Sequence, residues 1–273
     1  MMTIKLLALD LDGTLFNSQK VVSAENKKAL QAARDKGVKV VITTGRPLKA
    51  IGDLLEELDL ISDEDYVITF NGGLVQKTNG VILDKSELTR SQLHRLYSTL
   101  KPLALPFDVL SDGTVYSIPN QGTHSLYPQA NPKLKFVELE TFDDIPKNII
   151  YNKVVSVTEP AFLDKQILQI PKALYSDFEV FKSRDIILEM MPKGVHKAAG
   201  LQQLIEHLGL LPENVMAMGD EENDLSMLKW AGLGVAMANG VTIAKETADV
   251  VTTRTNDESG VAEAVEKYIL KTY

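Results

Sequence analysis

The chain has 273 residues, 44% of them hydrophobic and 24% charged, which is the composition of an ordinary globular protein of one or two domains. Its 29 basic and 37 acidic residues give a net charge of −8, which argues against nucleic acid or an anionic membrane surface as the main partner. The chain has no cysteine, so disulfides and thiolate zinc sites are excluded. No apolar run approaches the ~20 residues that span a bilayer, and the first residues lack the pattern of a secretory signal. We expect a cytoplasmic protein that is a monomer or a weak homo-oligomer and acts on a small molecule.

The first predicted element is a strand over residues 6–9, an unbroken apolar run of the kind that is buried on both faces of a parallel sheet. Asp10, Asp12 and Gly13 follow it directly. Buried carboxylates are costly unless a cation or hydrogen-bond donors compensate them, and ligands of open parallel sheets bind beyond the carboxyl ends of the strands. The two aspartates therefore predict a metal site, a proton-transfer role, or both. The alternative is that they cap a turn.

The next elements alternate between helix and strand, which indicates a parallel sheet with right-handed crossovers. The first helix has a serine as its N-cap and a glycine after its last turn. In order, we expect a helix over residues 23–36, a strand over 38–42, a helix over 48–58 and a strand over 66–70.

The pattern changes between about residues 83 and 190, where most of the prolines lie and the strands are short. This stretch predicts a separate α+β module inserted into the parallel sheet domain. Its expected elements are a helix over residues 91–100 and strands over 107–110, 114–118, 153–157, 178–181 and 186–190.

The first pattern returns after Gly194, so the two outer segments are predicted to form one Rossmann-like α/β core. The core is expected at residues 1–83 and 191–273, and the inserted domain at 84–190. The remaining expected elements are helices over 197–208, 225–231, 241–247 and 260–268 and strands over 215–218, 234–237 and 249–251.

Residues suited to binding an anion stand at one further strand end and at one helix start. Thr44 offers a hydroxyl at a strand end, and Gly45 leaves neighbouring backbone amides accessible. Lys197 stands at a helix start, where the macrodipole is already positive and does not stabilise a lysine. An anionic ligand would explain why a lysine stands at this position. The alternatives are a helix N-cap for Thr44 and an ordinary exposed lysine at 197.

An acidic cluster follows the strand at 215–218. Within five residues the chain has four acids, Asp220, Glu221, Glu222 and Asp224. A bound divalent cation usually offsets the repulsion between carboxylates that lie so close together. Oxygen ligands without cysteine indicate a hard ion such as Mg²⁺. A helix N-terminus rich in acids would explain Glu221 and Glu222, but it explains Asp220 poorly.

Together these groups suit a carboxylate that attacks phosphorus while a metal ion and a lysine neutralise the phosphate oxygens. Asp10 would form an aspartyl-phosphate. Asp12 would protonate the leaving alcohol and then deprotonate the water that hydrolyses the intermediate.

Residues 9–15, 42–46, 194–197 and 219–224 resemble motifs one to four of the haloacid dehalogenase (HAD) superfamily. Their order and spacing, with a large insertion between the second and third motifs, are similar to those of Cof-type, YidA-like sugar-phosphate phosphatases with an inserted C2-type cap. The resemblance spans essentially the whole chain and implies that residues 84–190 form the cap.

The resemblance also implies a role for each matching residue. Asp10 corresponds to the nucleophile and a metal ligand, and Asp12 to the general acid/base, which also gives a main-chain carbonyl to Mg²⁺. The expected phosphate binders are Leu11 through its amide, Thr44, Gly45, Lys197 and Asn223. The further metal ligands are Asp220 and Glu221, and the supporting polar residues are Asp224, Arg46 and Asn71.

The predicted function is a Mg²⁺-dependent phosphatase of small phosphorylated metabolites, with sugar phosphates as the expected substrates. One alternative is a phosphosugar mutase on the same core, in which the phosphoryl group passes to a sugar and not to water. The other is a sugar-phosphate sensor that has lost turnover, although a sensor has no need of the nucleophile Asp10.

Overall fold

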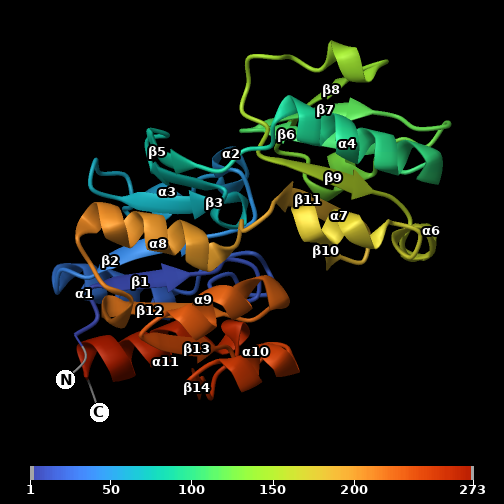
Figure 1. Cartoon of the computed structure of the whole chain (residues 1–273). Helices are drawn as coiled ribbons and strands as arrows, with labels where there is room; N and C mark the ends of the chain where they lie inside the picture. The colour runs from blue at the N-terminus through green and yellow to red at the C-terminus, as the bar shows by residue number, and fades with distance from the viewer. Residues whose placement is uncertain (1–2, 272–273) are drawn as a thin grey trace. The chain divides into compact units, whose positions relative to one another are not determined.

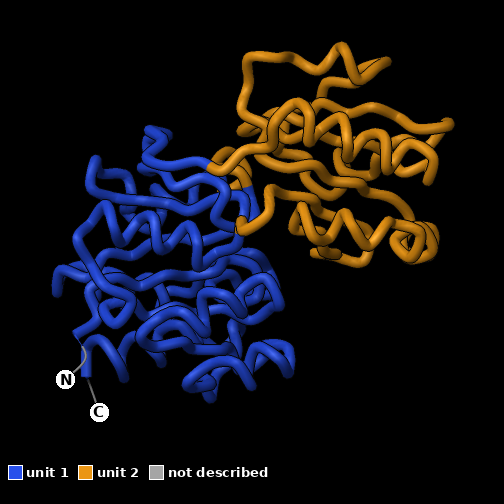
Figure 2. Tube along the Cα trace, in the orientation of Figure 1, with its two compact units in different colours: residues 1–46, 52–85, 196–273 blue, residues 47–51, 86–195 orange. Residues whose placement is uncertain are grey.

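The computed structural model describes residues 3–271, which form two compact units (Figure 2). The first unit comprises the described residues of 1–46, 52–85 and 196–273, and the second comprises 47–51 and 86–195. Segments from the two ends of the described chain therefore build the first unit.

The first unit is built on an eight-stranded sheet with the order β14-β13-β12-β1-β2-β3-β4-β5. The pairs from β14 to β3 are parallel, and β4 and β5 extend the sheet in antiparallel fashion. This arrangement confirms the predicted α/β core with a parallel sheet. The strands are β1 (Leu6–Leu9), β2 (Lys39–Thr43), β3 (Tyr66–Thr69), β4 (Leu74–Lys77), β5 (Ile82–Lys85), β12 (Val215–Gly219), β13 (Leu233–Ala236) and β14 (Val250–Val251).

The register of the three central strands aligns their carboxyl ends. Leu9, the last residue of β1, lies opposite Ile42 of β2 and Met218 of β12. The polar residues that follow these strands therefore leave the sheet at one edge, which is what positions the site described below.

Helices cover both faces of this sheet. On one face α8 (Lys197–Leu208) and α9 (Leu225–Trp230) pack against the central strands (Figure 1). Helices α1 (Ala24–Asp35) and α11 (Gly260–Val265) pack together, and the buried Asn26 side chain accepts a 2.8 Å hydrogen bond from the Ala262 amide between them. The remaining short helices of the unit are α3 (Leu54–Glu57) and α10 (Thr242–Thr247).

Most helix ends follow the sequence signals. Ser23 caps α1 by accepting from the Asn26 amide at 3.1 Å, and Gly209 ends α8 in the left-handed conformation with φ of 63°. The predicted continuous helix over 48–58 is wrong. Gly52, with φ of 71°, breaks it into α2 (Leu48–Ile51) and α3.

The second unit has a six-stranded sheet with the order β10-β11-β9-β6-β7-β8, antiparallel except for the β7–β8 pair. Leucines of α4, α6 and α7 pack on one face of it, against Val109 and Val154. The five predicted strands are confirmed. The strands are β6 (Phe107–Ser111), β7 (Thr114–Ile118), β8 (Lys135–Glu138), β9 (Lys153–Val157), β10 (Phe178–Arg184) and β11 (Ile187–Pro192), and the helices are α4 (Arg90–Leu100), α5 (Tyr127–Ala130), α6 (Pro160–Ile167) and α7 (Lys172–Asp177).

The short helix α2 belongs to the second unit although it follows motif two directly. Lys49 forms a 3.1 Å ion pair with Asp112 of the same unit. The aliphatic part of the Lys49 side chain also packs against Gly113, since a Cβ added to this glycine would lie 2.2 Å from the Lys49 Cδ. The predicted domains, a core at 1–83 and 191–273 and an insertion at 84–190, remain a prediction. The two compact units differ from these bounds at residues 47–51, 84–85 and 191–195.

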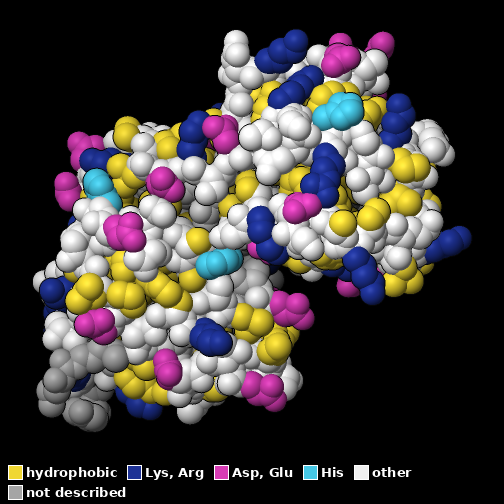
Figure 3. Space-filling model, viewed as in Figure 1, with side chains coloured by type: hydrophobic (Ala, Val, Ile, Leu, Met, Phe, Trp, Pro, Cys, Tyr) yellow, Lys and Arg dark blue, Asp and Glu magenta, His cyan; other side chains and the backbone are white. Residues whose placement is uncertain are grey.

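On the face shown in Figure 3, acidic and basic side chains are interspersed, so neither sign of charge dominates there. Among the described residues, no helix combines the length and apolarity that crossing a membrane requires.

Asp108 is a fully buried carboxylate in the second unit. It lies on β6 beside Val109, which packs under the helices, so its side chain leaves the opposite face of the sheet. It accepts hydrogen bonds from the hydroxyls of Ser117, at 2.5 Å, and Ser125. Burial raises the pKa of Asp108 to about 6, although the two hydroxyls act in the opposite direction.

The raised pKa predicts a pH dependence of stability. Since the pKa of Asp108 is higher in the folded than in the unfolded chain, its contribution is favourable below about pH 4 and is lost as the pH rises through 6. At pH 8 the ionised carboxylate then costs roughly 3 kcal/mol. We expect Asp108→Asn to raise the melting temperature relative to wild type more at pH 8 than at pH 5. An equal difference at the two pH values would contradict this assignment.

Candidate active site

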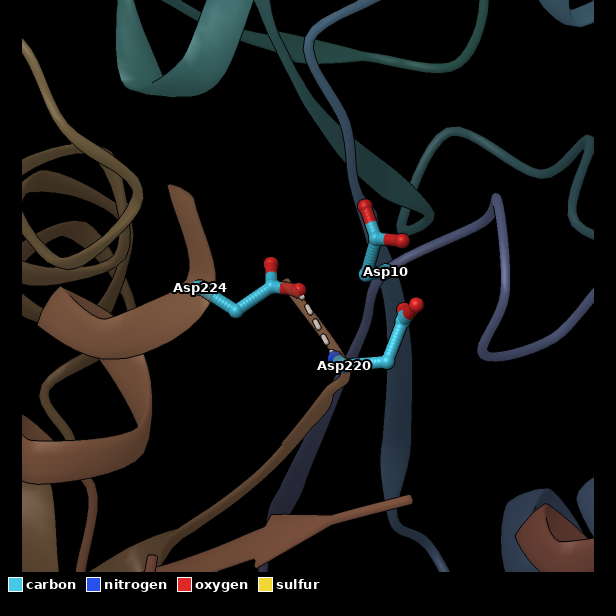
Figure 4. A group of neighbouring side chains, drawn as sticks. All are labelled: Asp10, Asp220 and Asp224. Carbon is cyan, nitrogen blue, oxygen red and sulfur yellow. Dashed lines mark hydrogen bonds between the residues drawn. The ribbon is translucent and has the colours of Figure 1, made fainter. Parts of the chain in front are cut away.

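Three buried carboxylates meet beyond the carboxyl ends of β1 and β12. Asp10 follows β1 and donates its amide to the Met218 carbonyl at 3.0 Å, and Asp220 follows β12. Asp224 comes from the 3-10 turn η5 (Glu222–Asp224). One oxygen of each carboxylate lies within 4.8 Å of the other two, and the three side chains converge in Figure 4.

Lys197 joins this group from the first turn of α8. Its side chain is fully buried, and its ammonium donates to Asp10 and, at 2.6 Å, to Asp224. The alternative of an ordinary exposed lysine is therefore wrong. The aspartates also do more than cap a turn, because the Asp10 side chain contacts this lysine.

Burial sets the protonation equilibria of the group. It raises the pKa of Asp10 well above its ordinary value, with Asp224 and Asp220 adding to the shift and Lys197 opposing it. It also raises the pKa of Asp220 to about 7, against the hydrogen bond from Thr14. For Lys197 burial lowers the pKa, but the two aspartates that it contacts outweigh burial and hold the pKa above its ordinary value.

The charge balance of this site suits a divalent cation. Three carboxylates face one ammonium, an excess of two negative charges when all are ionised. The donors are all oxygen, which fits Mg²⁺. Asp10 and Asp220 offer the carboxylates that such an ion would take, whereas Glu221 is exposed and lies outside the group of three.

Asp224 holds the acidic turn in shape. One of its oxygens accepts from Lys197, and the other accepts from the amides of Asp220, at 2.9 Å, and Glu221, at 3.0 Å (Figure 4). Gly219 permits this approach, since a Cβ there would lie 2.5 Å from the Asp224 side chain. These contacts correspond to the supporting role that the sequence suggested for Asp224.

Thr14 was not singled out from the sequence, yet it is part of the site. Its hydroxyl donates to Asp220 at 2.7 Å across 206 residues of chain and orients that carboxylate. The sequence feature that could have identified Thr14 is its position directly after Asp12 and Gly13 in the first motif.

Asp12 lies apart from the three carboxylates and contacts two cations. The Arg46 guanidinium donates to both of its oxygens, at 2.8 and 2.7 Å, and the Lys20 ammonium donates at 2.7 Å. Burial alone would raise the pKa of Asp12, but these two cations outweigh it and lower that pKa to about 2. Sequence reasoning missed Lys20, because nothing in a loop sequence shows where a flexible lysine side chain ends.

The turn after β2 and the turn after β3 support each other. Asn71, with φ of 54°, donates its amide to the Thr44 carbonyl at 2.9 Å, and its side chain lies against Gly45. Asn223 donates to the Asn71 side chain at 3.1 Å. The Thr44 hydroxyl accepts from the Arg46 amide at 3.2 Å. Asn71 therefore links the predicted phosphate-binding turn to the acidic turn.

Leu11 lies between the two motif-one aspartates. Its side chain is buried, and its carbonyl accepts from the Phe16 amide at 2.8 Å, which closes the loop after β1. The predicted phosphate contact of the Leu11 amide stays a prediction.

A lysine substitution tests the charge arrangement. We expect Lys197→Met to lower the free energy of unfolding in metal-free buffer by about 3 kcal/mol, because Asp10 and Asp224 would be left without their cation. Adding Asp224→Asn should recover part of the loss. Urea denaturation measures both, with the exposed Lys229→Met as the control. A Lys197→Met protein as stable as the control would refute this account.

Metal binding has its own test. We expect Mg²⁺ at about 100 times its dissociation constant to stabilise the wild type by roughly 3 kcal/mol, seen as a rise of several degrees in melting temperature. Asp220→Asn should abolish the rise, and the exposed Asp53→Asn should keep it. The same rise in Asp220→Asn would exclude Asp220 as a ligand.

Known proteins share this fold and chain length. Residues 7–265 match the family of haloacid dehalogenase-like hydrolases. The 5-amino-6-(5-phospho-D-ribitylamino)uracil phosphatase YcsE of Bacillus subtilis is 36% identical over 267 residues, which cover 98% of this chain and 96% of that protein.

Solved structures agree with the sequence relatives. A haloacid dehalogenase-like hydrolase from Bacteroides thetaiotaomicron superposes with a TM-score of 0.84 at 32% identity, covering 97% of this chain and 99% of that one. A HAD subclass IIB sugar phosphatase superposes with a TM-score of 0.79 at 26% identity, covering 97% and 98%. These matches confirm the resemblance inferred from the four motifs: the chain is an enzyme of the haloacid dehalogenase-like hydrolase family.

Proposed function

We propose that this enzyme is a Mg²⁺-dependent phosphatase of small phosphorylated metabolites, with sugar phosphates as its main substrates. The observation that carries the proposal is the pairing of the buried Asp10 carboxylate with Lys197, beside Asp220. A carboxylate held in this way is aimed and charge-balanced for attack on a phosphoryl group.

The proposed reaction has two steps at Asp10. First, a carboxylate oxygen of Asp10 attacks phosphorus, the ester P–O bond breaks, and Asp12 gives a proton to the departing alcohol. Second, Asp12 takes a proton from a water that attacks the aspartyl-phosphate, the bond between phosphorus and Asp10 breaks, and inorganic phosphate leaves. Asp10 returns as a carboxylate and Asp12 returns protonated.

The cations around Asp12 shape the proton transfer. With its pKa lowered to about 2, Asp12 is ionised at neutral pH, which is the form that a base needs. To act first as an acid it must be protonated, so its contact with Arg46 or Lys20 has to weaken when substrate binds. We propose that the negative charge of the substrate draws these cations away.

The remaining predicted site residues are proposed to hold the phosphoryl group. The Leu11 amide, Thr44, Gly45 and Asn223 would donate to its oxygens, and Lys197 would neutralise part of their charge. Arg46, Asn71 and Asp224 would support these groups through the contacts described above.

The ion is proposed to bind at Asp10, the main-chain carbonyl of Asp12, Asp220 and Glu221. When bound, Mg²⁺ supplies positive charge that offsets the negative charge of the phosphate oxygens. Support for it comes from the three buried carboxylates and the excess of negative charge that they leave. An all-oxygen donor set favours Mg²⁺ over softer metals.

The relatives support a sugar-like leaving group. YcsE is named for a phosphate ester of a ribityl chain, and the subclass IIB relative is named a sugar phosphatase. We propose that this chain likewise releases a polyhydroxylated alcohol, acts in the cytoplasm as a monomer or weak homo-oligomer, and uses the inserted unit as its cap.

A mutase and a silent sensor are the alternatives, and one assay separates all three. We expect the wild type to release free phosphate from a hexose 1-phosphate in Mg²⁺, and Asp10→Asn to lose roughly 10³-fold or more of this rate while the protein stays folded, as circular dichroism would show. Hexose 6-phosphate as the product would indicate a mutase. No turnover of any phosphorylated metabolite would indicate a sensor. Full activity of the Asp10→Asn variant would exclude Asp10 as the nucleophile.

A further inference from the structure

Lys20 sits at the tip of a tight loop after β1. The Asn17 amide donates to the Val21 carbonyl at 3.0 Å, and the Lys20 amide donates to the Asn17 carbonyl at 2.9 Å. The Asn17 side chain also accepts from the amides of Gln19 and Val21. Lys20 adopts the left-handed conformation with φ of 61°, which disfavours a residue with a Cβ.

The C-terminal part of the chain holds this loop in place. The Asn256 side chain donates to the Phe16 carbonyl at 2.9 Å, and the Ser18 amide donates to Asp257 at 2.7 Å. The backbone of residue 20 is therefore fixed from both sides, in a conformation that costs energy. Such strain persists where the surrounding structure imposes it, and it clusters at functional positions.

The ammonium of Lys20 brings a second positive charge to Asp12. Arg46 already donates to both oxygens of this carboxylate, so Lys20 is not needed to satisfy it. The Lys20 side chain is 60% exposed, and an ion pair of such exposure contributes little to stability. Lys20 therefore places a positive charge at an accessible position beside Asp12.

The proposed reaction places the leaving alcohol at this position. If Asp12 protonates the ester oxygen, that oxygen lies within hydrogen-bond distance of the Asp12 carboxylate. The ammonium of Lys20 is 2.7 Å from the same carboxylate. A substituent on the carbon that bears the ester oxygen therefore comes within reach of Lys20.

We infer that Lys20 is a specificity-determining residue that selects substrates with a second anionic group next to the phosphate ester, such as a phosphorylated sugar acid. The inference rests on the proposed phosphatase function and narrows its substrate class. This role of Lys20 differs from binding the transferred phosphoryl group. Every substrate has that group, so a contact with it would give no selectivity.

A matched pair of substrates tests this inference. In 2-phosphoglycerate the ester carbon carries a carboxylate, and in glycerol 2-phosphate it carries a neutral CH₂OH in the same place. We expect the wild type in Mg²⁺ to favour 2-phosphoglycerate by roughly tenfold in kcat/KM, as for a charge-assisted contact at a partly exposed site.

The variants separate selectivity from structure. Lys20→Met should bring the ratio of the two kcat/KM values to about one, with the larger rise in KM for 2-phosphoglycerate, and Lys20→Arg should restore the ratio. An effect of the substitution on proton transfer at Asp12 is common to both substrates and cancels in the ratio. Lys27→Met is the matched control, because Lys27 is also a partly exposed lysine in an ion pair, at 3.0 Å from Glu57. It should leave the ratio at the wild-type value.

Two results would overturn the inference: a wild-type ratio near one, or an unchanged ratio in Lys20→Met. An equal loss on both substrates leaves the ratio unchanged and would assign Lys20 to proton transfer at Asp12 or to the shared phosphoryl group. If the wild type releases phosphate from a hexose 1-phosphate but hydrolyses neither ester, this inference fails while the phosphatase proposal stands. If it turns over no phosphorylated metabolite, both fail.

Discussion

The site depends on one buried ammonium. Lys197 lies between Asp10 and Asp224 with no exposed surface, so its charge acts in a medium of low dielectric constant and is bound to both carboxylates. These three residues come from motifs one, three and four, and the lysine is the contact that joins them. Because Asp220 adds a third carboxylate, the group keeps an excess of negative charge that favours a cation.

Close backbone packing allows Lys197 to reach that place. Gly72, with φ of 100°, lies so near the His196 carbonyl that a Cβ on it would come within 2.2 Å. A Cβ on Gly200 would come within 2.8 Å of Gly72. The turn after β3 and the start of α8 are therefore in direct contact, and a larger residue at either glycine would push the lysine away from Asp10.

Asp12 has a different environment from Asp10, although one residue separates them. Asp10 faces other carboxylates and has a raised pKa, whereas Asp12 faces Arg46 and Lys20 and has a lowered one. Strand β1 ends at Leu9, and the turn that begins at Leu11 sends the two carboxylates to different surroundings. Burial and the neighbouring carboxylates therefore favour the protonated form of Asp10, whereas the two cations favour the ionised form of Asp12.

Local patterns were sufficient to predict the core sheet, most helices and the proximity of Asp10, Lys197 and Asp220, because buried parallel strands carry an apolar signature and their carboxyl ends meet at one edge. Only the tertiary structure decided the break at Gly52, the strands β4, β5 and β8, and the contacts of Thr14 and Lys20. The short strands are stabilised by pairing with neighbours that a local window does not contain, and the hydrogen bond of Thr14 joins residues 206 positions apart. The sequence by itself thus determined which chemical groups are present and at which strand ends they stand, whereas the pairing of each charge with its partner depends on distances that exist only in the folded chain.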